Sequence, residues 1–327
     1  MIALPSVLCG DGLPPRFDLR PGLWTTTELP LGLPDHWRTW VGSLRAETLS
    51  DGDLFIVAGG PAEEPDVLDD ENEGYVRQAF SLYLGLLVSD FFYAHAPPHR
   101  LTGANRGGEV DVRSIGELEA PLAIPGTPLT EVTAARLVKA AELADAIDGV
   151  RRADGFERMG RALQSFRDGI EERNVAEKLH QFLRCVEGFI IPEVGNTLSR
   201  LRSRTEVFIG PGHHERVTEW FNIRSAVEHL HPPDEAVPSD DLRVRRLRIM
   251  RRAMEVEAVA RHCLQKILLN AGLRGRFRTD GDIEAFWDEA RDNRQDMWGE
   301  PLDLGQVEDS FEERFVDDHD LGIEEPA

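Results

Sequence analysis

The sequence predicts an α+β protein that is mostly α-helical, with a smaller mixed α/β domain over residues 1–125 and a helical bundle over 126–298. Three observations support this class. From Thr130 onward, apolar residues recur at helical spacing almost throughout. Residues 1–125 alternate between short strand-like runs and turns rich in proline and glycine. An apolar share of 41% over 327 residues is enough for a buried core, and this length favours two domains.

The N-terminal domain is predicted from local patterns. The expected elements are a helix over 35–48 capped by Asp35, a buried strand over 54–57, a helix over 71–96 and an edge strand over 110–112. Each is bounded by a residue that breaks regular structure, such as Pro97 after the second helix. Residues 121–128, which begin and end with proline, are expected to link the two domains.

The second domain is predicted from amphipathic periodicity. The expected helices cover residues 130–147, 156–170, 176–191, 215–228, 239–270 and 283–291. In the longest, Ile249, Ala253, Val256, Ala260, Cys263 and Ile267 keep a spacing that suits helix packing. Residues 299–327 are acidic and are expected to form a mobile tail.

Charge and cysteine content limit the classes of function. The formal net charge of −22 argues against broad affinity for nucleic acids, because an acidic body repels phosphates. Eleven of the acidic residues lie between Glu300 and Glu325. The three cysteines lack CxxC spacing, so neither a disulfide scaffold nor a zinc ribbon is indicated. Without a secretory signal or an apolar run long enough to span a bilayer, we expect a cytoplasmic protein that does not enter the membrane.

The candidate catalytic residues are Arg224 and His229, which lie near the end of an apolar helix that Pro232 terminates. Histidine is suited to proton transfer near neutral pH. Arginine presents a planar fork of donors to a phosphate group. An arginine followed after four residues by a histidine therefore indicates metal-independent cleavage of a phosphodiester.

An alternative interpretation gives Arg224 a structural role. Four pairs in the chain fit an Arg-x(4–6)-His spacing, and about three are expected by chance, so the spacing is not specific by itself. Residues five apart lie about 140° apart on an ideal helix, so the helix would have to unwind for Arg224 and His229 to meet. Otherwise Arg224 pairs with Glu228 one turn away, and His229 and His231 only terminate the helix.

The residues around this motif resemble HEPN domains. The stretch from Arg224 to His229 resembles the Arg-x(4–6)-His signature of that superfamily. The helices over 180–191 and 251–269 are similar to those that flank the motif in the Apea-like HEPN group, and the resemblance is best over residues 173–270. It implies an antiparallel helical bundle of four or more helices, commonly a homodimer.

The resemblance also implies a reaction. HEPN ribonucleases cut RNA without a metal or cofactor, through attack by the ribose 2′-OH, and leave a 2′,3′-cyclic phosphate and a 5′-OH. In that scheme His229 moves protons, and Arg224 stabilises charge in the transition state. Glu187, Glu228 and His231 are expected to support the pair; Glu187 could orient either residue or form a simple salt bridge. Such a nuclease would act as a toxin in stress or anti-phage defence, and a regulatory protein partner is an expectation of the same resemblance.

The chain departs from the family pattern at Ser225, where a larger polar residue is common, and at Leu230, where glycine is common. Many HEPN-like domains bind without cleaving. The alternative function is therefore a catalytically inactive HEPN-like module that binds a partner protein or a nucleotide.

An arginine run offers a candidate RNA-binding surface. Arg243, Arg245, Arg246 and Arg248 begin a cluster of six arginines that ends at Arg252. The cluster could instead be a solvated helix face paired with nearby carboxylates, or it could be covered by the acidic tail. His213 and His214 match no compact ligand spacing, so no metal is expected.

Overall fold

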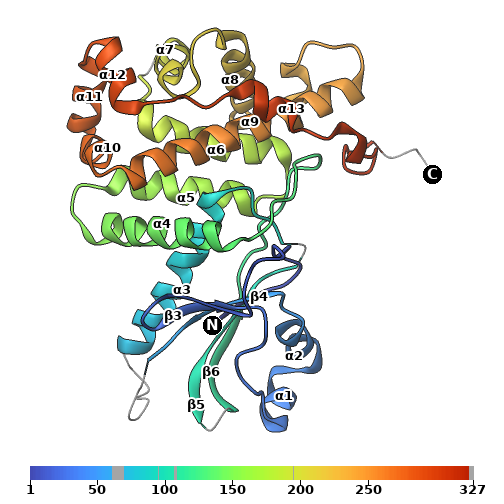
Figure 1. Ribbon diagram of the computed structural model, residues 1–327. Helices are drawn as coiled ribbons and strands as arrows, with labels where there is room; N and C mark the ends of the chain where they lie inside the picture. Colours follow the sequence, from blue (N-terminus) through green and yellow to red (C-terminus); the bar gives the residue numbers. More distant parts are fainter. Residues whose placement is uncertain (61–69, 95, 107–108, 194, 324–327) are drawn as a thin grey trace. The chain divides into compact units, whose positions relative to one another are not determined.

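The computed structural model describes residues 1–60, 70–94, 96–106, 109–193 and 195–323 (Figure 1). It is mostly helical with a small antiparallel sheet, which confirms the predicted α+β class. The chain forms two compact units: residues 1–122 with 129–148, and residues 123–128 with 149 onward. The predicted domain boundary at residue 125 therefore differs from the structure, because most of the first helix after the linker belongs to the N-terminal unit.

The N-terminal unit is built on one sheet. Its described strands are β1 (Ile2–Leu4), β2 (Arg16–Arg20), β3 (Leu23–Thr26), β4 (Leu54–Ala58), β5 (His99–Arg106) and β6 (Glu109–Glu117). They lie in the order β2-β3-β4-β1-β5-β6, and every neighbouring pair is antiparallel. The predicted buried strand is β4, in the interior of the sheet, and the predicted edge strand is part of β6, at one edge. Both predictions are confirmed.

Two short helices cover one face of this sheet. Helices α1 (Asp35–Val41) and α2 (Ser43–Ser50) pack Val41 and Leu49 against Phe55 and Val57 of β4. The sequence predicts one helix here, but the chain turns at Gly42, whose φ of 92° lies in the left-handed region. The turn lets both helices contribute to the same apolar cluster.

Helices α3 (Asp70–Ser89) and α4 (Ala134–Arg152) belong largely to the same unit and pack closely within it. A Cβ added at Gly85 of α3 would lie 2.1 Å from the backbone oxygen of Ala140 in α4. Only glycine permits this approach, because any side chain would collide with main-chain atoms. The close contact therefore fixes how α3 packs on the part of α4 that belongs to this unit.

The end of α3 differs from the prediction. The helix stops at Ser89 rather than near residue 96. The buried guanidinium of Arg136 donates to the carbonyl oxygens of Asp90 and Phe91 at 3.1 and 2.9 Å, and so satisfies acceptors just beyond the helix end. Thr130, which begins the predicted helix over 130–147, lies before the start of α4 and donates its hydroxyl to the carbonyl oxygen of Phe91.

The second unit is helical around α6 (Val175–Ile190), which packs against α5 (Glu157–Glu171), α8 (His214–Glu228) and α9 (Leu242–Leu269). Asn174 caps α6 by accepting from the backbone N–H groups of Ala176 and Glu177. The predicted apolar face of α6 and the predicted seam of α9 are buried. Helix α7 (Thr197–Ile209) joins α6 to α8, and no helix among the described residues is long and apolar enough to cross a membrane.

The chain then returns across this unit. Helices α10 (Ala271–Arg276), α11 (Asp280–Asp288) and α12 (Arg291–Trp298) surround an aromatic cluster that contains Phe208, Phe277, Phe286, Trp287 and Trp298. Residues 299–323 are packed, which differs from the expected mobile tail. They include α13 (Leu304–Asp309), and their apolar residues Leu304, Phe311, Val316 and Leu321 are buried. Burial of these side chains offsets the repulsion among the acidic residues between them.

The α3–α4 packing is tested by substitution of Gly85 with alanine. We expect Gly85→Ala to lower the free energy of unfolding by about 2 kcal/mol, because the new methyl group overpacks a backbone contact. The matched control is Gly74→Ala on the same helix, where an added Cβ meets nothing within 4 Å. There we expect a gain of about 0.5–1 kcal/mol from helix propensity. Equal effects of the two changes in urea unfolding would contradict the close approach.

Candidate functional site

Arg224 lies on α8 where that helix faces α6. The neighbouring residues Ile223 and Val227 are buried in the bundle, which keeps Arg224 at the border between core and solvent. Its side chain is 17% exposed. One terminal nitrogen of its guanidinium is paired with Glu228, and the other lies 3.4 Å from Oε2 of Glu187 on α6. Arg224 is therefore held between two carboxylates, as the structural alternative predicts for Glu228.

The two carboxylates differ in their surroundings. The Glu187 side chain is 8% exposed, whereas that of Glu228 is 43% exposed. Burial raises the pKa of Glu187, and the negative charge of Glu228 adds to this effect, while Arg224 opposes it. Burial and the charge of Arg224 therefore act in opposite directions on the pKa of Glu187, and burial is the larger effect.

His229 is the C-cap of α8 and is exposed to solvent. The backbone N–H groups of His231 and Leu230 donate to Ala226 and Val227, which is the hydrogen-bond pattern of a Schellman motif. Leu230 occupies the left-handed position, with a φ of 59°, that glycine usually takes. This motif ends the helix without unwinding it toward Arg224.

The imidazole of His229 therefore does not complete the expected pair in this conformation. Its ring lies beside that of His231, at a centroid distance of 6.5 Å. No hydrogen bond or ion pair joins it to Arg224 within the described chain. His231 is also exposed. Both histidines thus face solvent, five and seven residues after the arginine.

The charge of Arg224 also acts on a third histidine, His180. His180 of α6 has a side chain that is 14% exposed, with Nδ1 at 3.7 Å from Oε2 of Glu177. Burial lowers the pKa of His180, and the positive charges of Arg224 and Arg184 lower it further. The imidazole is therefore neutral at physiological pH, the form that can accept a proton.

His180, Arg184 and Glu187 recur at four and three residues along α6, and with Arg224 and Glu228 of α8 they form a group that we call the α6–α8 cluster. In the described structure, Nδ1 of His180, Oε1 of Glu187 and Nε of Arg224 are buried without a hydrogen-bond partner. Such atoms are costly to leave unpaired. The sequence places His180 and Arg184 four residues apart on one helix face, where they could join the same polar pocket as Arg224 or, as the favoured interpretation, lie at the bundle surface. The structure places both within reach of the charge of Arg224 or of each other.

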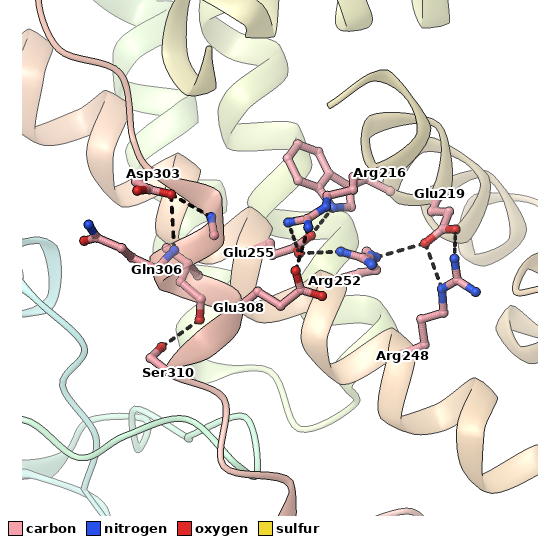
Figure 2. A network of polar contacts seen from close by, with 12 residues as sticks. Arg216, Glu219, Arg248, Arg252, Glu255, Asp303, Gln306, Glu308 and Ser310 are labelled. Atoms are coloured by element: carbon pink, nitrogen blue, oxygen red, sulfur yellow. Dashed lines mark hydrogen bonds and ion pairs between the residues drawn. The ribbon is translucent and has the colours of Figure 1, made fainter. Parts of the chain in front are cut away.

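Arg248, expected to bind RNA, is part of a network of ion pairs between α8 and α9 (Figure 2). Arg248 and Arg252 both donate to Glu219. Glu255, which is fully buried, accepts from Arg252, from Nε1 of Trp220 at 2.9 Å and from Arg216 at 3.3 Å. The network satisfies buried charges, and removal of one partner from such a pair costs about 3–5 kcal/mol. It is therefore structural.

The other arginines expected to bind RNA also have partners within the chain. Arg243 pairs with Asp318 and donates to the carbonyl oxygen of Val316 at 3.2 Å. Arg245 donates to the carbonyl of Ser239. Arg246 donates to the carbonyl of Leu321, and its Nε lies 3.5 Å from Asp234. The arginine face of α9 is thus paired in this conformation.

Metal-ligating groups are sparse in the described chain. Asp317, His319 and Asp320 have ligand atoms within 4.8 Å of one another, but all three are exposed. The carboxylates of Asp317 and Asp320 already accept backbone N–H groups from each other. His214 pairs with Glu206 at 2.8 Å, away from any such group.

Comparison of the chain with family models, with curated proteins and with solved structures found no match.

Leu230 provides a test of the helix terminus. A leucine in the left-handed region carries a steric cost of about 1–2 kcal/mol, and this side chain is 92% exposed, so it contributes little packing. We expect Leu230→Gly to raise the free energy of unfolding by about 1 kcal/mol in urea titrations. Leu230→Ala keeps the Cβ and is expected to change it little. A loss of stability in the glycine variant would show that Leu230 packs against something.

The pKa of Glu187 predicts a pH dependence. Because the folded state raises this pKa, the unfolded chain releases the proton first as pH rises from acidic to neutral, so stability falls over that range. Glu187→Gln removes the titrating carboxyl group and therefore this dependence of stability on pH. We therefore expect the difference in unfolding free energy to move in favour of the variant as pH rises from about 4.5 toward 7. A shift in favour of the wild type would show that the bond to Arg224 outweighs burial.

Proposed function

We propose that this protein is a metal-independent endoribonuclease of the HEPN type, with its active site centred on Arg224. The observation that supports this most directly is the α6–α8 cluster. A guanidinium lies there beside an imidazole whose pKa is lowered, and the same helix ends in the exposed His229. An anion-binding group and proton carriers are the two components that phosphodiester cleavage without a metal requires.

The proposed reaction begins with attack of a ribose 2′-oxygen on the adjacent phosphorus. The 2′-OH gives up its proton, the bond from phosphorus to the 5′-oxygen breaks, and the leaving oxygen takes up a proton. His229 carries these protons, and Arg224 stabilises the charge that builds on the phosphate oxygens. The products are a 2′,3′-cyclic phosphate and a 5′-OH. His231 lies beside His229 and supports it.

For this reaction a phosphate must gain access to Arg224. Glu228 is the partner that would give way, because an exposed pair one turn apart on a helix contributes only about 0.2–0.5 kcal/mol. A phosphate offers the guanidinium fork charge-assisted hydrogen bonds of the same kind, so it can take the place of Glu228. Glu187 is more deeply buried and stays in contact, where it orients the guanidinium. The supporting roles of Glu187 and Glu228 thus differ.

A second candidate function has its own support. Both terminal nitrogens of Arg224 are engaged by carboxylates, and His229 makes no contact with the arginine among the described residues. This arrangement favours a catalytically inactive HEPN-like module that binds a partner protein or a nucleotide. The proposals of a homodimer, a regulatory protein partner and a role in stress or anti-phage defence apply to both candidates.

The proposed activity is tested by incubation of the full chain with mixed RNA in EDTA. We expect cleavage to persist, because no metal takes part, and to fall by at least about a hundredfold in Arg224→Ala and in His229→Ala. The matched control is the double variant Arg314→Ala with His319→Ala, which removes another arginine and histidine of the same spacing. It is expected to cleave as the wild type does.

Each outcome separates the candidates. Intact RNA with all proteins, under conditions in which the chain is folded, supports the binding module. Cleavage that EDTA abolishes would contradict the metal-independent mechanism. Cleavage that survives Arg224→Ala would place the active site elsewhere or indicate a contaminating nuclease.

A further inference from the structure

The acidic C-terminal segment lies against the arginine side of the bundle. We call residues 303–323 the acidic strap. The strap is held by apolar side chains, because Leu304, Phe311, Val316 and Leu321 are all buried. Its backbone is also tied down where the N–H of Glu312 donates to the carbonyl of Gly126 at 2.8 Å. These contacts place the acidic residues between the anchors alongside α8 and α9.

Three carboxylates of the strap, each five residues after the last, contact arginines of the bundle. Glu308 pairs with Arg216 at 2.6 Å, Glu313 pairs with Arg251, and Asp318 pairs with Arg243. Two carbonyl oxygens of the strap accept from the same face, Val316 from Arg243 and Leu321 from Arg246. The strap thus presents oxygen acceptors to four guanidinium groups of the bundle.

The charged contacts are replaceable, whereas the apolar anchors hold the strap. The side chains of Arg243 and Arg251 are 41% and 35% exposed, and their carboxylate partners are more exposed still. Ion pairs of this kind contribute about 0–1 kcal/mol each. The two arginines are eight residues apart on one helix, about 12 Å along its axis. This array suits a chain of negative charges, because each guanidinium fork matches a phosphate as well as a carboxylate.

We propose that Arg243, Arg246 and Arg251, the arginines of α9 that the acidic strap contacts, form a binding surface for the phosphodiester backbone of single-stranded RNA, and that the strap occupies this surface as an intramolecular competitor. The strap explains how a chain with a net charge of −22 can hold a phosphate-binding face without binding nucleic acid in general. Displacement of its carboxylates exposes the arginines. The inference concerns binding and does not depend on the proposed cleavage.

The experiment compares the full-length wild type with the double variant Glu313→Gln and Asp318→Asn, which keeps the length and the apolar anchors of the strap. The probe is a fluorescent single-stranded oligonucleotide with 2′-O-methyl groups, which lacks the nucleophile for cleavage, so binding is measured apart from any nuclease activity. At low salt we expect about tenfold tighter binding by the variant, from two arginines that become available to phosphates. The slope of log K against log salt is expected to steepen by about 1.4.

A charge-matched control makes the result specific. Glu312→Gln with Asp317→Asn removes the same charge from the same segment, but Glu312 pairs with Arg314 and Asp317 accepts from the backbone of Asp320, not from α9. This control is expected to bind the probe as the wild type does. Addition of Arg243→Gln and Arg251→Gln to the first variant is expected to remove its gain.

Three results would overturn the proposal. Equal gains in the first variant and the charge-matched control would show an effect of net charge alone. No gain in the first variant, with an unchanged thermal unfolding curve, would show that the face does not bind RNA when its carboxylates are removed. A gain that survives the arginine substitutions would place RNA binding on another surface and also contradict the assignment.

Discussion

The pairing of Arg224 with one buried and one exposed carboxylate is the interaction on which the candidate site depends. Glu187 is buried against the bundle and is charged only at a cost, which the guanidinium offsets. Glu228 adds a weak, exposed bond on the other side. The arginine is therefore oriented by the fold and yet open to exchange of one partner. A group with these properties can bind a phosphate without a rearrangement of the helices that carry it.

Arginines are paired with oxygen acceptors along α9 as well, where each described arginine of the run has such a partner. Toward the interior, Arg252 and Glu255 form pairs that water cannot replace, and these fix α8 against α9. Toward the surface, the partners come from the acidic strap and are exposed. The arginines in buried pairs are therefore structural, whereas those in exposed pairs are the ones that a ligand can reach. It also accounts for the excess of acid, because much of the negative charge lies in the segment that covers the basic face.

Much of the fold could be predicted from the sequence. The periodicity of residues 176–191 and 239–270 predicted α6 and α9 to within a few residues, since amphipathic faces of this length are specific. The division of the helix after Asp35 could not be predicted, because Gly42 adopts a left-handed turn that tertiary packing selects. The packed state of residues 299–323 was missed because charge dominates their composition, and four well-spaced apolar anchors are a weaker signal than nine acidic residues.

The candidate site was predicted in part. Spacing on a helix indicated that Arg224 would reach Glu228, and the position of Glu187 on the preceding helix indicated a third member. The sequence could not show that a Schellman motif would keep His229 in solvent, since leucine rarely takes the left-handed position. Nor could it show that burial would make His180 a neutral base, because that depends on the packing of α6 against α8. The HEPN resemblance supplies the proposed chemistry, and the geometry supplies Arg224 as its centre.

The most direct measurement of the central claim is the identity of the RNA ends that the full chain produces in EDTA, determined by mass spectrometry of a short defined oligonucleotide. The account predicts a 2′,3′-cyclic phosphate on one fragment and a 5′-OH on the other, because only the ribose 2′-oxygen acts as nucleophile. Fragments with a 5′-phosphate and a 3′-OH, or an oligonucleotide that stays intact, would contradict it.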